Sequence, residues 1–199
     1  MRFTVRDLVY IGVFGALWGV LELSFGSLLH MFNLPFSGGI MVALGIAVAL
    51  VGRMFVPKSG SIFLIGVVAA LLKLLSLGGV VLNPLLGILI ESALAELAVS
   101  ALGRPSRISY LLAGILAALW AVFQPVLTMG IMGGTGLIAA LTFIAERGAK
   151  TLGVGADVLV AILAVLVAIH VVFGIVAGVL GWEVGRAVHA QRTQLQGAE

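Results

Sequence analysis

The segment from Asn83 to Leu102, NPLLGILIESALAELAVSAL, decides the fold class because it carries two carboxylates, Glu91 and Glu96, within an apolar run. In lipid, a carboxylate is costly unless it is paired, protonated or turned toward a polar cavity. The two acids are five residues apart, about 140° around an ideal helix, so they face different neighbours. We therefore expect this helix to line a cavity on one side and to hold a packing contact on another.

The composition places the whole chain among polytopic membrane proteins. It has 199 residues, of which 62% are hydrophobic and 10% are charged, far outside the range of soluble domains. Without cysteine, neither a disulfide framework nor a thiolate metal site is available. The net charge is only +3 and the basic residues lie in short loops, so nucleic acid is not an expected partner. The first apolar run lacks a cleavage site, which indicates a spanning helix and not a removable signal peptide.

Six apolar runs have about the 20 residues that a helix needs to cross a bilayer. Because lipid offers no partner to an unpaired backbone group, these runs are expected to be helical. The sequence therefore predicts an all-α bundle of six transmembrane helices in a single domain, residues 1–199. The predicted spans are 8–29, 38–56, 62–82, 85–102, 108–130 and 156–182.

The distribution of lysine and arginine predicts that both termini are cytoplasmic, because basic residues favour the cytoplasmic side of a membrane. One predicted side has only Arg147 and Lys150. The other side has a larger set: Arg2, Arg6, Arg53, Lys58, Arg104, Arg107, Arg186 and Arg192. The expected location is therefore a cell membrane that the chain crosses several times, and the family resemblance described below implies a prokaryotic plasma membrane.

The predicted exterior connections are longer than the cytoplasmic turns. Residues 130–155 begin with a glycine-rich stretch and continue into a short helix expected near Leu137 to Arg147. We interpret this segment as a lid. The other exterior connection, His30 to Ser37, holds Asn33, and its alternative interpretation is an anchor at the membrane interface.

Four predicted helices each carry a polar residue at a similar depth, roughly 9 to 13 Å below the exterior boundary at about 1.5 Å per residue. These residues are Glu22, Lys73, Glu91 and Gln124. Such residues generally face a bundle interior, so a cavity open to the exterior is predicted, with Lys73 and Glu91 as its expected ion pair. The alternative is a polar network that only joins the helices. The candidate substrate-binding residues are Glu22, His30, Asn33, Lys73, Asn83, Glu91, Gln124 and Thr128.

Deeper in the membrane, Glu96 and His170 fall at matched depth, where they could pair or form one step of a proton path. The more ordinary interpretation of a single histidine is a hydrogen-bonded core residue. No group of residues has the spacing of a metal site, and no catalytic motif is present. The sequence therefore predicts no catalytic residue, no metal and no cofactor.

Two stripes of small residues lie at the predicted cytoplasmic side. Small residues four apart allow helix backbones to approach closely, and packing of this kind associates helices in lipid. Such stripes serve either internal packing or contact with a partner. The first stripe comprises Gly12, Gly15, Ala16 and Gly19, and the second comprises Gly174, Gly178, Gly181 and Gly185.

Nearly the whole chain resembles the membrane-embedded substrate-binding (S) components of energy-coupling factor (ECF) transporters, a vitamin-uptake branch of the ABC systems. The segment YIGVFGALWG, from Tyr10 to Gly19, matches the small-residue motif of that family's first helix. The segments VVAALLK, ending at Lys73, and GILIESALAE, ending at Glu96, look most like the hydroxymethylpyrimidine/thiamine-type subunit.

The resemblance implies a function without chemistry in this chain. The subunit would capture a vitamin or related micronutrient, with a thiamine precursor as the nearest candidate. It would then join a transmembrane T component, through the first helix at Gly12, Gly15, Ala16 and Gly19, together with two cytoplasmic ATPases. Two alternatives remain open from the residues: an ion-coupled carrier or channel that works alone, and a membrane scaffold without transport activity.

Overall fold

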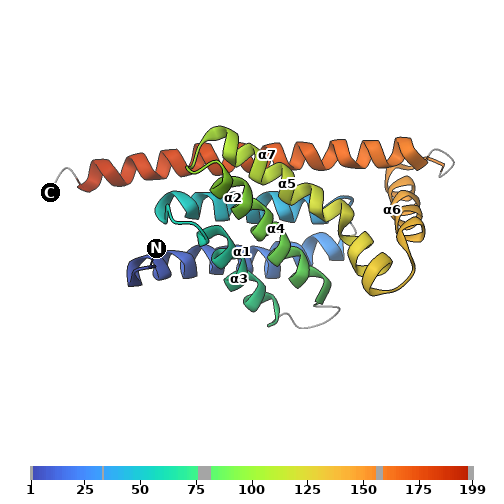
Figure 1. The fold of residues 1–199 in the computed structure, drawn as a ribbon, viewed down its shortest axis with the longest axis horizontal. Helices are drawn as coiled ribbons and strands as arrows, with labels where there is room; N and C mark the ends of the chain where they lie inside the picture. Colours follow the sequence, from blue (N-terminus) through green and yellow to red (C-terminus); the bar gives the residue numbers. More distant parts are fainter. Residues whose placement is uncertain (1, 33, 76–81, 156–158, 197–199) are drawn as a thin grey trace.

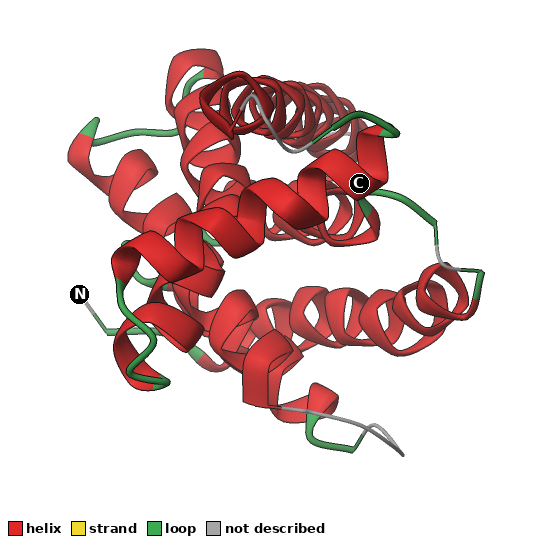
Figure 2. Cartoon of the chain, turned by 90° about the vertical axis from the view of Figure 1, so that its right-hand side faces the viewer, coloured by secondary structure: helices red, strands yellow, loops and turns green. Residues whose placement is uncertain are grey.

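The computed structural model describes residues 2–32, 34–75, 82–155 and 159–196, and within them it contains helices and loops but no strand (Figure 2). The prediction of an all-α fold is therefore confirmed for the part of the chain that is described. The helices are α1 (Val5–Met31), α2 (Ser37–Phe55), α3 (Ser61–Lys73), α4 (Leu82–Ala101), α5 (Arg107–Pro125), the π-helix η1 (Val126–Met132), α6 (Leu137–Leu152) and α7 (Leu159–Gln196).

Five stretches of helix are long and apolar enough to cross a membrane: those of α1, α2, α4 and α7, and α5 continued by η1. The third predicted span, 62–82, differs from the structure. Helix α3 has 13 residues, about 20 Å at 1.5 Å per residue, and Leu74 and Leu75 form a turn. Residues 76–81 of that prediction lie outside the described residues. The prediction of six transmembrane helices is thus not confirmed as a whole.

The helices run roughly along one long axis, with the start of α1 and the end of α7 at the same end of the bundle (Figure 1). We call this the terminal end and the opposite one, which carries α6, the distal end. Helix α7 packs against α5 and α2, while α1 packs against α3 and α2; α4 lies between α3 and α5. This arrangement brings the middle helices into one apolar core.

The glycine stripe of α1 explains why α3 is its neighbour. A Cβ on Gly15 would lie 2.5 Å from Val68 Cβ, and a Cβ on Gly19 would lie 2.7 Å from Leu72 Cδ1. Both glycines therefore face α3 of the same chain, because only a residue without a side chain fits there. A Cβ on Gly12 would have no atom within 4 Å. Within this stripe, Gly15 and Gly19 are therefore used for internal packing, whereas Gly12 faces no other part of the described chain.

The second stripe joins α7 to α5 and α2. A Cβ on Gly178 would lie 2.6 Å from the carbonyl oxygen of Tyr110, and one on Gly174 would lie 2.5 Å from Ile115 Cα. Gly181 and Gly185 take the side chains of α2 residues in the same way. Among the alternatives that the sequence left open, internal packing therefore accounts for this stripe.

Helix α6 lies across the distal end, at a steep angle to the long helices (Figure 1). The short helix predicted near Leu137 to Arg147 is present and continues to Leu152. Its apolar face packs against α5 and α7 in a second, smaller core that includes Ile144, Ala145, Ile162 and Leu166. Because this core is separate from the main one, α6 covers the bundle without being part of its centre.

The outer faces of the long helices are apolar. Val13 and Leu17 of α1 and Val172 and Ile175 of α7 are among the exposed large hydrophobic residues. In the most apolar 18-residue stretch of α7, only 17% of the residues are buried inside the protein. The hydrocarbon core of a membrane is therefore the environment that suits this surface. The chain is thus a helical, multi-pass membrane protein.

Candidate functional site

A cavity of about 780 Å³ opens at the distal end, between the start of α2, the end of α5, α6 and α7. We call it the distal cavity. Its size falls within the range of small-molecule sites, and it combines an apolar wall with several polar groups, as such sites do. It is lined by Leu29, Leu34, Pro35, Phe36, Ser37, Gly38, Gly39, Asn83, Ala121, Val122, Gln124, Pro125, Phe143, Ile144, Arg147, Gly148, Lys150, Thr151, Leu166 and His170.

The start of α2 contributes backbone amides to the cavity. Helix α2 begins without a hydrogen bond from a capping side chain, and residues 37–39 of its first turn line the cavity. The first N–H groups of a helix have no partner within the helix, and they carry its positive dipole end. This wall of the distal cavity is therefore suited to a hydrogen-bond acceptor or to negative charge.

Phe36, immediately before α2, has a left-handed backbone with φ of 58°, the only positive φ among the described non-glycine residues. Such a conformation is unfavourable for a bulky residue, and residues of this kind are concentrated at functional sites. The Phe36 ring lies 6.3 Å from the His170 ring, edge to face. The strained backbone thus holds an aromatic ring at the wall of the distal cavity.

His170 of α7 is 9% exposed and turns one ring nitrogen to its own helix, because Nδ1 lies 2.8 Å from the carbonyl oxygen of Leu166. Since a carbonyl only accepts, Nδ1 carries the hydrogen of that bond. Among the described residues, Nε2 has no hydrogen-bond partner. A Cβ on Gly39 would lie 3.4 Å from Nε2, so this nitrogen of the imidazole lies beside the start of α2.

Two cations, Arg147 and Lys150, line the cavity from α6. Neither forms an ion pair with any residue that the structure describes. No carboxylate is among the described lining residues. Sequence reasoning used these two residues only to orient the chain, although their position in an amphipathic exterior helix was a signal that they could face a ligand.

The distal cavity includes two of the eight predicted substrate-binding residues, Asn83 and Gln124. Their contact joins the start of α4 to the end of α5, because Gln124 Nε2 donates to Asn83 Oδ1 at 2.8 Å and to the Asn83 carbonyl oxygen at 2.7 Å. Thr128 donates to the carbonyl oxygen of Gln124 at 3.1 Å, a bond within the helix. Asn33 and the side chain of His30 lie outside the described residues.

Three of the other predicted residues, Glu22, Lys73 and Glu91, form a buried charge cluster that does not line the cavity. Lys73 Nζ lies 3.4 Å from Glu22 Oε2 and donates to the carbonyl oxygen of Glu22 at 3.2 Å. The predicted pair of Lys73 with Glu91 is therefore wrong. The physical reason is the close approach of α1 to α3 at Gly15 and Gly19, which places Glu22 beside the end of α3.

Glu91 is 6% exposed and has no hydrogen bond or ion pair with any residue that the structure describes. It lies close enough to Glu22 for the two carboxylates to repel each other. Glu91 and Gln124 approach the same glycine of α4, because a Cβ on Gly87 would lie 3.1 Å from Gln124 Oε1 and 3.4 Å from Glu91 Oε1. Of the polar residues predicted to share one layer around a cavity, Gln124 lines the distal cavity, whereas Glu22, Lys73 and Glu91 are not among its described lining residues.

The prediction that Glu96 could pair with His170 is also wrong. Glu96 lies toward the terminal end, where its Oε1 is 3.1 Å from Arg53 Nη1 and its Oε2 accepts from the Ile62 amide at 2.9 Å. Helix α3 starts at Ser61 without a side-chain cap of its own, so the Glu96 carboxylate supplies one from α4. Arg53 also donates to the carbonyl oxygen of Lys58 and to Ser61 Oγ.

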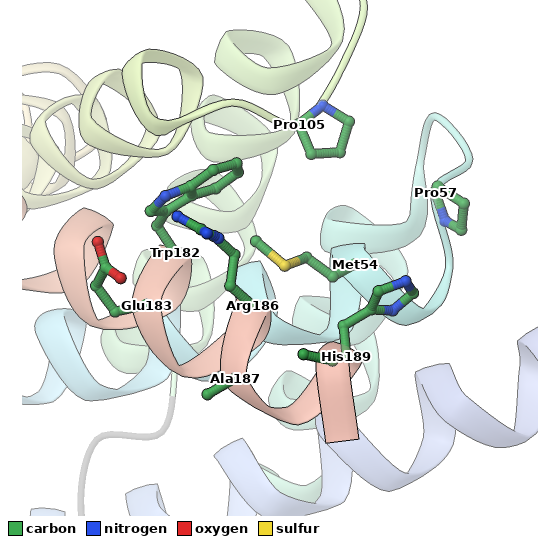
Figure 3. Close-up of a pocket in the computed structure, with 9 residues that line it drawn as sticks. Met54, Pro57, Pro105, Trp182, Glu183, Arg186, Ala187 and His189 are labelled. Atoms are coloured by element: carbon green, nitrogen blue, oxygen red, sulfur yellow. The ribbon is translucent and has the colours of Figure 1, made fainter. Parts of the chain in front are cut away.

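A second hollow, which we call the terminal groove, lies at the other end of the bundle (Figure 3). Its volume is about 590 Å³, and Met54, Pro57 and Pro105 face it from the end of α2 and from the loops. Arg186 lies 5.7 Å from the centre of the Trp182 ring on α7. The groove has a mixed lining with one arginine, one glutamate and one histidine, so it has less convergent chemistry than the distal cavity.

No family model, curated protein or solved structure matches this chain. Within the described residues, no group of three histidine, aspartate or glutamate side chains is placed to hold a metal ion.

Proposed function

We propose that this chain is the substrate-binding subunit of an ECF-type importer, which captures a vitamin or related micronutrient from the exterior. The observation that carries the proposal is the distal cavity, which is large enough for a small metabolite and is covered by a helix outside the main bundle. The resemblance of the sequence to ECF S components supports it. In this proposal, a T component and two ATPases supply the energy for transport.

The covering helix fits the capture of a ligand from one side. Helix α6 lies between glycines with positive φ, since Gly134 and Gly136 precede it and Gly153 follows it, at 69°, 87° and 70°. Glycine adopts this backbone without steric cost, so both ends of α6 have connections that tolerate rearrangement. A lid on such connections would admit a ligand and close over it.

The test is binding by the purified subunit alone, followed by transport with and without partners. A small-molecule extract of the source cells is added to the chain in phosphatidylcholine nanodiscs, and the retained compound is identified by mass spectrometry. We expect one stoichiometric metabolite, and no uptake of it into liposomes that contain only this chain. Uptake by the chain alone would contradict the proposal, as would the absence of any retained compound.

One observation favours a second candidate, the ion-coupled carrier. Glu91 is a buried carboxylate with no partner among the described residues, and it lies near a second carboxylate. Buried acids of this kind are found in proton pathways. A carrier would show proton-coupled flux in liposomes that contain only this chain, and the flux would be lost in Glu91→Gln. The same liposome experiment therefore decides between the two candidates.

A further inference from the structure

We propose that the ligand of the distal cavity is a soluble organic anion, with a carboxylate or phosphate group held by Arg147, Lys150 and the start of α2. This inference rests on the proposed function and names the substrate class. It replaces the thiamine precursor, which the resemblance implied as the nearest candidate, with a different class of ligand. It also assigns the anion to residues other than Lys73.

The first step is the sign of the charge in the cavity. The charged side chains among its described lining residues are Arg147 and Lys150. Both lie on the covering helix and both lack an ion-pair partner in the described part of the chain. A cationic ligand in this cavity would meet two like charges and no opposite one. An anionic ligand would find two charged donors, which form the stronger class of hydrogen bonds.

The second step is the opposite wall. Residues 37–39 bring the uncapped start of α2 to the same cavity, and a helix start favours an anion through its free N–H groups and its dipole. The buried His170 lies beside this wall, and its Nε2 has no hydrogen-bond partner among the described residues. Because Nδ1 holds the hydrogen in the neutral ring, Nε2 accepts a hydrogen bond. We therefore assign His170 to an N–H or O–H group of the ligand, not to its anionic group.

The third step concerns the two nearby acids, Glu22 and Glu91, which do not contribute negative charge to the described lining of the cavity. Lys73 forms an ion pair with Glu22, and the described lining residues of the cavity do not include Glu22, Lys73 or Glu91. The apolar lining, with Phe36 and Phe143, suits the flat body of a ring compound. The lining of the distal cavity thus suits a small heteroaromatic or similar metabolite with one anionic group and at least one hydrogen-bond donor.

The same cations could instead bind the phosphate of a lipid headgroup, and the experiment separates the two sources. A delipidated small-molecule extract is divided on an anion-exchange column into a retained, anionic fraction and an unretained fraction. Each is added to the full chain in nanodiscs of pure phosphatidylcholine, and the Tm is measured. In a separate arm, phosphatidylglycerol is added to the nanodiscs without any extract. The variants are Arg147→Gln/Lys150→Gln and, as a matched control at the terminal end, Arg104→Gln.

We expect the anionic fraction to raise the Tm of the unmodified chain and of Arg104→Gln, because a ligand that binds only the folded state stabilises it. The double variant should need about ten times more of this fraction for the same shift. Stabilisation by the unretained fraction, or by the anionic fraction equally in the double variant, would overturn the inference and leave the proposed function standing. A shift with phosphatidylglycerol that only the double variant loses would assign the cations to lipid and also overturn it. If neither fraction stabilises the chain, the proposed function itself fails.

Discussion

At the scale of single residues, the contact of Arg53 with Glu96 is the least exposed ion pair in the described part of the chain. The side chains are 5% and 11% exposed, and the Glu96 carboxylate also caps α3. Loss of one partner leaves the other buried and uncompensated, which typically costs about 3 to 5 kcal/mol. We therefore expect Glu96→Gln to lower the free energy of unfolding strongly, as measured by denaturant titration in detergent.

The control for this prediction is Lys58→Gln, which removes the ion pair with Asp7 at 2.5 Å, where both side chains are more exposed. Exposed ion pairs contribute little, so this variant should remain close to the unmodified chain in stability. The double variant Arg53→Leu/Glu96→Leu should recover part of the loss, because it leaves neither charge alone. Equal stabilities of Glu96→Gln and Lys58→Gln would contradict this account of the pair.

Phe36 allows a test of backbone strain at the same scale. With φ at 58°, Phe36→Gly removes the ring and the strain together, whereas Phe36→Ala removes the ring and keeps the strain. A non-glycine residue in this region costs about 1 kcal/mol, so Phe36→Gly should be the more stable variant by about that amount. Both should weaken ligand binding at the distal cavity. Equal stability of the two variants would show that the backbone is not strained there.

At the scale of helices, the stripe in α1 predicts different outcomes at neighbouring glycines. Gly15→Leu should prevent the approach of α1 to α3, since even a Cβ would lie 2.5 Å from Val68 Cβ, while Gly12→Leu meets no atom at the Cβ position. We expect Gly15→Leu to lower the yield of folded protein and Gly12→Leu to leave it unchanged, as measured by size-exclusion chromatography. Under the proposed function, Gly12→Leu should then reduce only copurification with the T component. Normal folding of Gly15→Leu would contradict the packing.

The helices themselves were predictable from the sequence because lipid leaves an apolar segment few alternatives to a helix. The residues at which the helices end were less predictable. The apolar run continues past Lys73, and hydropathy alone does not mark the turn at Leu74 and Leu75. The 140° separation of Glu91 from Glu96 correctly indicated two different surroundings, one beside Glu22 and one beside Arg53.

The partners of these acids could not be predicted, because chain order does not fix which helices touch. A short connection made α3 and α4 expected neighbours, and they are, but Lys73 turns instead to Glu22 on α1. The pairing follows from the close α1–α3 packing, for which the small residues at positions 15 and 19 were the available signal. The amphipathic pattern of α6 was a signal for Arg147 and Lys150, but their position at the distal cavity depends on how α6 lies across the distal end, which the pattern does not give.

At the scale of the whole molecule, the orientation in the membrane decides whether the distal cavity serves import. Helix α7 has 38 residues, about 57 Å of helix, against a hydrocarbon core of about 30 Å. It therefore extends beyond the core, and at the terminal end it carries Arg186 and the groove around Trp182 (Figure 3). From the excess of basic residues we propose that this end is cytoplasmic, and in this orientation the distal cavity opens outward.

The cysteine-free sequence makes this orientation directly measurable. Thr135→Cys puts a thiol in the distal loop before α6, and Ser59→Cys puts one in the loop between α2 and α3 at the terminal end; both positions are exposed. In intact cells, a membrane-impermeant maleimide should label only Thr135→Cys, and Ser59→Cys should react after permeabilisation. The reverse pattern would place the distal cavity on the cytoplasmic side. Capture of a scarce nutrient from outside would then be impossible through this cavity, and the importer proposal would fail whatever the ligand is.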